Sequence, residues 1–169
     1  IAPGDAVAAP TVAWSGRRAL VLFRAGTSSE LRYTLLTPEL GKLIDDARLT
    51  QDGAGAPNAF AVTRDPRGGF AAAWIEPATG RVLFARIDNE GGLASGPTEL
   101  ASAAAGRSEV AVTGTSSGFV VMWNDTVRAI DIAGTPSGAP AAVSALGSNL
   151  SLLWSGAEVT LLSRSASKS

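Results

Sequence analysis

The sequence contains neither cysteine nor histidine among its 169 residues. A chain without cysteine forms no disulfide and offers no thiolate for catalysis or metal binding. A chain without histidine has no imidazole base for a Ser-His-Asp triad and no His-ligated zinc or iron site. Because these absences exclude the commonest nucleophilic and metal-dependent mechanisms, we assign no catalytic residue, no cofactor and no metal site.

Charge is also scarce, since charged residues make up 17% of the chain and the formal net charge is -1. A protein that binds nucleic acid needs a basic field to hold phosphates, and this composition provides none. No uninterrupted apolar run approaches the roughly 18 residues of a membrane-spanning helix. We therefore expect neither a nucleic-acid partner nor a transmembrane segment.

What the sequence does contain is an internal repeat. Shifting the chain by 51 positions lays residues 18–41 on residues 69–92 without a gap. A further copy of the same apolar segment follows at residues 116–123, and the tripeptide Trp-Ser-Gly that begins at Trp14 recurs at Trp154. Repeats of about 40 to 50 residues built from short strands are typical of β-propeller blades.

Each repeat divides into short strands separated by turns rich in Gly, Pro, Ser and Asp, and helical periodicity is nearly absent. We predict an all-β, propeller-type array of four-stranded antiparallel blades in one domain spanning residues 1–169. The expected blades are residues 10–55, 56–105, 106–146 and a partial blade at 147–164, with a polar tail at 165–169. This makes about three and a half blades.

Strand composition predicts a gradient of burial across each blade. The second strands, at residues 20–23, 70–74 and 119–123, are continuous apolar runs and are expected to be buried on both faces. The third strand at residues 82–87 alternates apolar and polar side chains, so we expect solvent on one of its faces. Fourth strands are expected at residues 45–50, 98–102 and 141–144.

Closure of the ring is not accounted for by this number of blades, because closed propellers usually have about four to eight. Three solutions are compatible with the sequence. The chain is part of a longer propeller, two copies close a seven-bladed ring, or residues 1–10 and a partner complete a compact four-bladed ring. We favour a missing segment or a partner chain, with a second copy of this chain as the next choice.

The repeat pattern also resembles a known class of protein. The clearest copy joins Gly-Phe-Ala-Ala-Ala-Trp at residues 69–74 to Arg-Ile-Asp-Asn-Glu-Gly-Gly at residues 86–92. This pattern is similar to the degenerate propeller repeats of secreted bacterial repeat proteins and lipoproteins. It lacks the Ser-x-Asp-x-Gly-x-Thr-Trp box of sialidase-like propellers and the marks of WD40 repeats. The resemblance implies an extracytoplasmic binding or scaffold propeller, and the start at Ile1 agrees with removal of a signal peptide or with a piece of a longer protein.

Candidate ligand-binding residues are few. The turn Asp88-Asn89-Glu90 offers oxygens that suit calcium, but it lacks the acidic ladder of a calcium loop, so we interpret it as a structural turn. Trp14 and Trp154 are candidate stacking platforms for a sugar ring.

The remaining motifs favour structural roles. Trp74 and Trp123 end buried strands and are expected to pack between blades. The match to G-x-S-x-G at residues 114–118 joins two strands, whereas a nucleophile elbow joins a strand to a helix. Scattered carboxylates in turns are expected to satisfy local backbone groups.

These observations favour a non-enzymatic, extracytoplasmic binding or scaffold module completed by a protein partner or a second copy. A carbohydrate-binding lectin is the alternative. A histidine-free carbohydrate-active enzyme that uses paired carboxylates is a more distant one.

Overall fold

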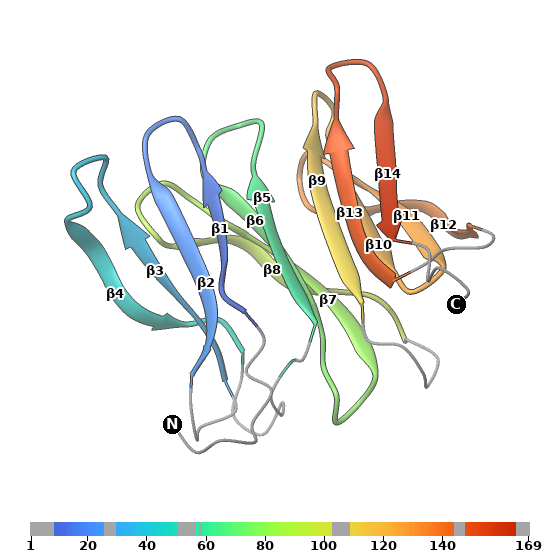
Figure 1. Cartoon of the computed structure of the whole chain (residues 1–169), viewed down its shortest axis with the longest axis horizontal. Helices are drawn as coiled ribbons and strands as arrows, with labels where there is room; N and C mark the ends of the chain where they lie inside the picture. Colours follow the sequence, from blue (N-terminus) through green and yellow to red (C-terminus); the bar gives the residue numbers. More distant parts are fainter. Residues whose placement is uncertain are drawn as a thin grey trace.

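The computed structural model describes residues 9–25, 30–50, 57, 59–102, 109–143 and 148–164, and these ranges fold as four antiparallel sheets (Figure 1). Three sheets have four strands each and the last has two, which confirms the predicted all-β array of about three and a half blades. The predicted tail at 165–169 lies outside the described residues, as do residues 1–8 of the proposed closing segment 1–10. The strands are β1 (Thr11–Trp14), β2 (Ala19–Ala25), β3 (Glu30–Leu36), β4 (Lys42–Arg48), β5 (Phe60–Arg64), β6 (Phe70–Ile75), β7 (Arg81–Ile87), β8 (Leu93–Ser102), β9 (Val110–Thr115), β10 (Gly118–Trp123), β11 (Thr126–Asp131), β12 (Pro136–Ala142), β13 (Ser148–Trp154) and β14 (Val159–Arg164).

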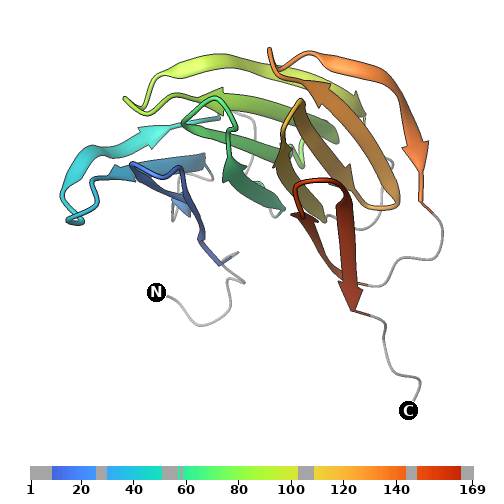
Figure 2. The same cartoon turned by 90° about the horizontal axis from the view of Figure 1, so that it is seen from above.

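The four sheets are arranged as successive blades, which we number 1 to 4 along the chain. The first strands of neighbouring blades contact one another, with β1 against β5, β5 against β9 and β9 against β13. Seen from above, these first strands lie on the concave side of the array and the fourth strands β4, β8 and β12 on the convex side (Figure 2). This fan of blades around their first strands is the arrangement of a propeller that does not close within the described residues.

Blade 2 is buried on both faces because it has a neighbour on each side. In β6, Phe70 and Trp74 point into a core shared with blade 1, whereas Ala71 and Ala73 point into a core shared with blade 3. Every residue of β6 is buried, as the apolar run predicts. Trp74 and Trp123 are both buried in these cores, which confirms that they pack blade against blade.

The prediction that the third strand faces solvent on one side is wrong for blade 2. All of β7 is buried except Arg81 at its start, so Arg86 is inside the protein despite its charge. In blade 1, by contrast, both β2 and β3 alternate between buried and half-buried positions. The apolar run of β2 is therefore not buried on both faces, because blade 1 has a described neighbour on one side only.

The fourth strands begin earlier than predicted, immediately after the preceding turn. They run from Lys42, Leu93 and Pro136, and each contacts the third strand with irregular register. These strands contain charged residues, glycine and proline and therefore lack the apolar alternation by which a strand is predicted. Such residues are tolerated because the fourth strand is an exposed outer edge.

All four blades join their first and second strands with a turn that a side-chain oxygen stabilises. The hydroxyl of Ser15 accepts a hydrogen bond from the Arg18 amide, and that of Ser155 accepts one from the Glu158 amide, both at 3.1 Å. Asp65 and Thr115 accept the equivalent bond from the amide two residues on. The recurring Trp-Ser-Gly tripeptide is thus the sequence mark of one turn, which places Trp14 and Trp154 at equivalent positions.

Asp65 has a second role, because it compensates the buried charge of Arg86. One carboxylate oxygen accepts hydrogen bonds from Arg86 Nε at 2.7 Å and from its terminal amino group at 2.6 Å. The Asp65 and Arg86 side chains are 1% and 10% exposed, and the guanidinium lies 6.0 Å from the centre of the Phe119 ring. The pair therefore links β7 to the first turn of its own blade and to the core of blade 3.

We predict that Asp65→Ala lowers the free energy of unfolding by about 3–5 kcal/mol, because it leaves the guanidinium of Arg86 buried and uncompensated. Asp45→Ala is the matched control, since Asp45 forms an exposed ion pair with Lys42 and should change stability by at most about 1 kcal/mol. Urea unfolding followed by tryptophan fluorescence measures both. Equal effects of the two variants would contradict a structural role for the buried pair.

Candidate functional site

The turn Asp88–Gly92, a candidate ligand site by sequence, is stabilised by its own side chain. Asp88 Oδ1 accepts hydrogen bonds from the Glu90 amide at 2.9 Å and the Gly92 amide at 2.8 Å. The equivalent turn of blade 3 is held by Asp131 Oδ1, and that of blade 1 by the hydroxyl of Thr37. Because a threonine serves as well as an aspartate, the carboxylate fits a turn-stabilising role.

The same turn also attaches blade 2 to blade 1. The hydroxyl of Tyr33 donates a hydrogen bond to the Gly91 carbonyl at 2.7 Å, and the Ser15 hydroxyl donates one to Asn89 Oδ1 at 2.9 Å. Gly91 has a φ of 89° and lies so close to blade 1 that an added Cβ would stand 2.6 Å from Ile44 Cγ1. Glu90 alone of the three candidate residues is exposed.

Blade 3 repeats this contact on blade 2. Its turn places Gly134 against Arg86 and Ser95, and the guanidinium of Arg67 donates a hydrogen bond to the Ile132 carbonyl at 3.0 Å. The turn between third and fourth strands is therefore a recurring contact between blades. The contact of this turn with the preceding blade was not predicted from the sequence, although the shift that lays Gly41 on Gly92 shows that the turn repeats.

The carboxylates of Asp45, Asp46 and Glu76 form separate local ion pairs. Glu76 is buried and accepts hydrogen bonds from Arg81, which raises the pKa of that guanidinium through the hydrogen bond and the opposite charge. Asp46 contacts Arg32, and Asp45 contacts Lys42. Within the described ranges, no three acidic side chains converge on a site that could hold a metal ion.

One face of the blade 1 sheet has no neighbouring blade among the described residues, and we call it the leading face. Over β1 and β2 this face is apolar, with Val12 63% and Trp14 50% exposed and with Val21 and Phe23 half-buried. These residues share the face because cross-strand partners such as Val12 and Val21 point to the same side of a sheet. The leading face is thus apolar at its inner half.

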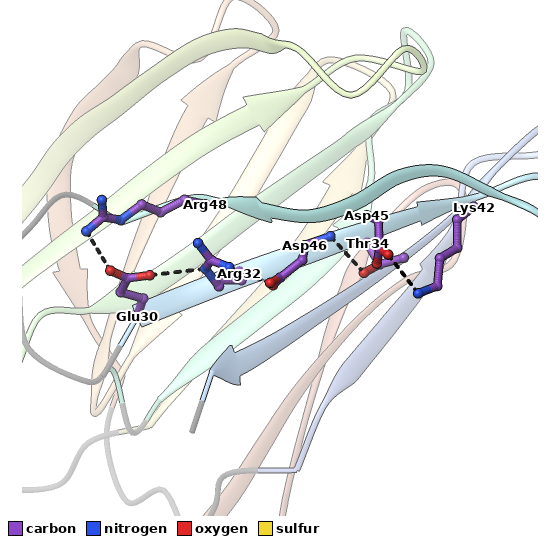
Figure 3. A network of polar contacts seen from close by, with 7 residues as sticks. All are labelled: Glu30, Arg32, Thr34, Lys42, Asp45, Asp46 and Arg48. Atoms are coloured by element: carbon purple, nitrogen blue, oxygen red, sulfur yellow. Dashed lines mark hydrogen bonds and ion pairs between the residues drawn. The ribbon is translucent and has the colours of Figure 1, made fainter. Parts of the chain in front are cut away.

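The outer half of the leading face is charged but internally neutralised (Figure 3). Glu30 accepts hydrogen bonds from Arg32 Nε at 3.0 Å and from Arg48 at 2.6 Å, while Arg32 also pairs with Asp46. Two acids and two bases alternate along β3 and β4, so the row has little net charge. It resembles the polar rim of an interface around an apolar centre.

Leu40 distinguishes the leading face from the junctions inside the array. It occupies the turn position of Gly91 and Gly134, has a φ of 64° and is 74% exposed. An added Cβ at Gly91 or Gly134 would come within 2.6 Å of the preceding blade. A blade packed in the same way on blade 1 would therefore collide with Leu40.

Trp154 differs from its equivalent Trp14 because blade 3 precedes it. It is half-buried and lines a groove of about 400 Å³ at the ends of the inner strands β5, β9 and β13. At Gly114 strand β9 approaches blade 2 so closely that an added Cβ would stand 2.4 Å from the Arg64 carbonyl oxygen. Its lining is Thr63, Arg64, Pro66, Thr113, Gly114, Thr115, Ser116, Leu153 and Trp154.

The described part of the chain contains no helix long and apolar enough to cross a membrane. Repeated four-stranded blades joined through their first strands define a protein of the β-propeller type.

Comparison with known proteins supports this fold. No protein-family model matches the sequence, and no curated protein matches it either. Among solved structures, the crystal structure of BBS1N in complex with ARL6DN matches with a TM-score of 0.54 at 14% identity, and BBS1N is a β-propeller. The match covers 98% of this chain and 54% of BBS1N, so the chain spans about half the length of that neighbour.

Tyr33 offers a direct test of the contact between blades 1 and 2, because it is the single tyrosine of the chain. Burial, and then the negative charge of Asp88, raise the pKa of its hydroxyl above the ordinary value of 10.0. The folded state therefore holds the phenolic proton more tightly than the unfolded state. This contribution to stability is complete below pH 10 and is lost as the pH rises through the folded pKa.

We predict that the phenolate absorbance at 295 nm titrates with a midpoint above 10.0 in the folded protein. In concentrated urea the midpoint should return to the ordinary value. Asp88→Asn should lower the folded midpoint while Glu90→Gln leaves it unchanged. Identical midpoints in folded and unfolded protein would contradict the buried contact with Gly91.

Proposed function

We propose that this chain is a non-enzymatic binding or scaffold module and that a partner protein covers its leading face. The observation that carries the proposal is the apolar patch formed by the exposed Val12 and Trp14 with the half-buried Val21 and Phe23. Patches of this kind at the centre of a polar rim are typical of protein interfaces. Inside the array the corresponding face of blade 2 is buried by the preceding blade.

The leading face also restricts the chemistry of the partner. An apolar surface has to meet β1 and β2, and polar but uncharged groups suit the neutralised row around Glu30 and Arg32. The partner also has to leave a recess for Leu40. The complex of BBS1N with ARL6DN supports the proposal, because it shows a propeller of similar fold bound to another protein.

We further propose that the module acts outside the cytoplasm. The support is the likeness of residues 69–74 and 86–92 to repeats of secreted bacterial proteins and lipoproteins. The native particle should accordingly be recovered from the extracytoplasmic fraction of the source cells. Recovery from the cytosol alone would contradict this location.

Light scattering on that particle, with mass spectrometry of its chains, tests the partner. We expect a second polypeptide, and the Trp14→Ser variant should weaken its association by at least about tenfold, equivalent to about 1.4 kcal/mol. Leu93→Ser is the matched control, because Leu93 is 48% exposed but lies on the outer strand β8. A particle with one copy of this chain and no partner would contradict the proposal, and a particle of two copies would assign the leading face to self-association.

Carbohydrate binding is the second candidate, and the groove beside Trp154 favours it. An indole face suits the apolar side of a pyranose, while Arg64 and the hydroxyls of Thr113, Thr115 and Ser116 line the same groove. The inner ends of several strands meet there, which is where a propeller commonly receives a ligand.

A glycan array followed by calorimetry tests this candidate. If the groove binds a sugar, Trp154→Ala should reduce the affinity by at least about tenfold, a loss typical of removing a buried aromatic anchor. Trp14→Ala serves as the control, because Trp14 occupies the equivalent position on blade 1 and does not line the groove. Absence of glycan binding, or equal losses in the two variants, would remove carbohydrate as a ligand.

A further inference from the structure

Strand β14 differs from the second strand of every other blade. In blades 1 to 3 the second strand is paired on both sides, by the first strand and by the third. Among the described residues β14 is paired with β13 alone. One edge of β14 therefore presents backbone amide and carbonyl groups that its equivalents use in the sheet.

Composition shows that this edge is not built as an outer edge. The fourth strands, which are true edges, carry charged residues in β4, Gly96 and Pro97 in β8, and Pro136 and Pro140 in β12. Such residues prevent unwanted strand pairing. Strand β14 reads Val-Thr-Leu-Leu-Ser-Arg, with no proline and with its one charge at the end.

The equivalence of the blades also gives the register of the absent neighbour. The Trp-Ser-Gly turns align Val159 with Ala19 and Leu162 with Leu22. Leu162 is 54% exposed, whereas Leu22 is fully buried. Leu22 is buried in the core shared with blade 2, so the position of Leu162 is one that a following blade covers elsewhere in the array.

The three complete blades place similar residues opposite these two positions. Opposite the Val159 position stand Leu36, Ile87 and Ile130. Opposite the Leu162 position stand Tyr33, Phe84 and Val127. The third strand therefore reads Tyr, Phe or Val, then any two residues, then Leu or Ile, and Thr37, Asp88 or Asp131 follows at once to hold the turn.

We propose that β14 accepts an antiparallel strand of a partner polypeptide with this pattern, its aromatic or Val residue opposite Leu162 and its Leu or Ile opposite Val159. The proposal deepens the proposed function, since it identifies a second contact of the partner and its chemistry. Backbone hydrogen bonds supply the pairing and the two apolar side chains supply the register.

A peptide copying residues 81–88, Arg-Val-Leu-Phe-Ala-Arg-Ile-Asp, is a suitable probe because it is the third strand of blade 2. We expect the labelled peptide to bind by fluorescence anisotropy and to protect residues 159–164 from hydrogen exchange. The same peptide with F84S and I87S should bind at least about tenfold more weakly, because both cross-strand apolar pairs are lost. In the protein, Leu162→Ser should reduce binding by a similar factor, and Leu93→Ser should leave it unchanged.

Equal binding of the two peptides, or protection elsewhere in the chain, would overturn the proposal. Protection of residues 159–164 that rises with protein concentration in the absence of peptide would also overturn it, because it would show that the β14 strands of two copies pair with each other. A native particle whose partner association depends on Trp14 while β14 stays unprotected and binds no peptide would overturn this inference and leave the proposed function standing. If the peptide binds at β14 but the native particle contains no partner, the strand-pairing inference stands and the proposed function is contradicted.

Discussion

Each blade is a sheet with two faces, and both faces have to be buried against neighbouring blades. In blade 2 this requirement is met on both sides, so β6 and β7 are buried almost throughout, including Arg86. Apolar burial is non-directional, however, and would tolerate several relative placements of two such sheets. The apolar faces therefore hold the blades together without fixing how one blade sits on the next.

Directional polar contacts fix that placement, and the same turn makes them in both junctions. The turn between third and fourth strands reaches back to the preceding blade, through Gly91 and Tyr33 in one junction and through Ile132 and Arg67 in the next. Glycine at the point of closest approach leaves room for side chains of the preceding blade, Ile44 in one junction and Ser95 in the next. In blade 1, which has no preceding blade within the described residues, Leu40 occupies the equivalent position. Its exposed side chain can therefore contact a different partner.

The repeat made the fold and the burial of Trp74 and Trp123 predictable, because a shifted copy of the sequence aligns both pattern and turns. Burial of individual strands was not predictable in the same way. Alternation in β3 and its loss in β7 reflect whether a blade has one neighbour or two, which no local window contains. The ion pair of Asp65 with Arg86 was also missed, since it joins the first turn of blade 2 to its third strand. The groove beside Trp154 was missed because residues of three blades line it.

The two ends of the array present unlike surfaces. The leading face is a sheet face with an apolar centre, a neutralised charged row and a projecting Leu40, whereas β14 presents a strand edge beside Leu162. A twofold dimer would use both ends only if the leading face of each copy met the β14 end of the other, as in a ring closed by two copies. In such a ring a blade of the second copy packed in the usual way on blade 1 would collide with Leu40, whereas a partner polypeptide that leaves a recess for Leu40 and supplies a strand beside β14 satisfies both ends.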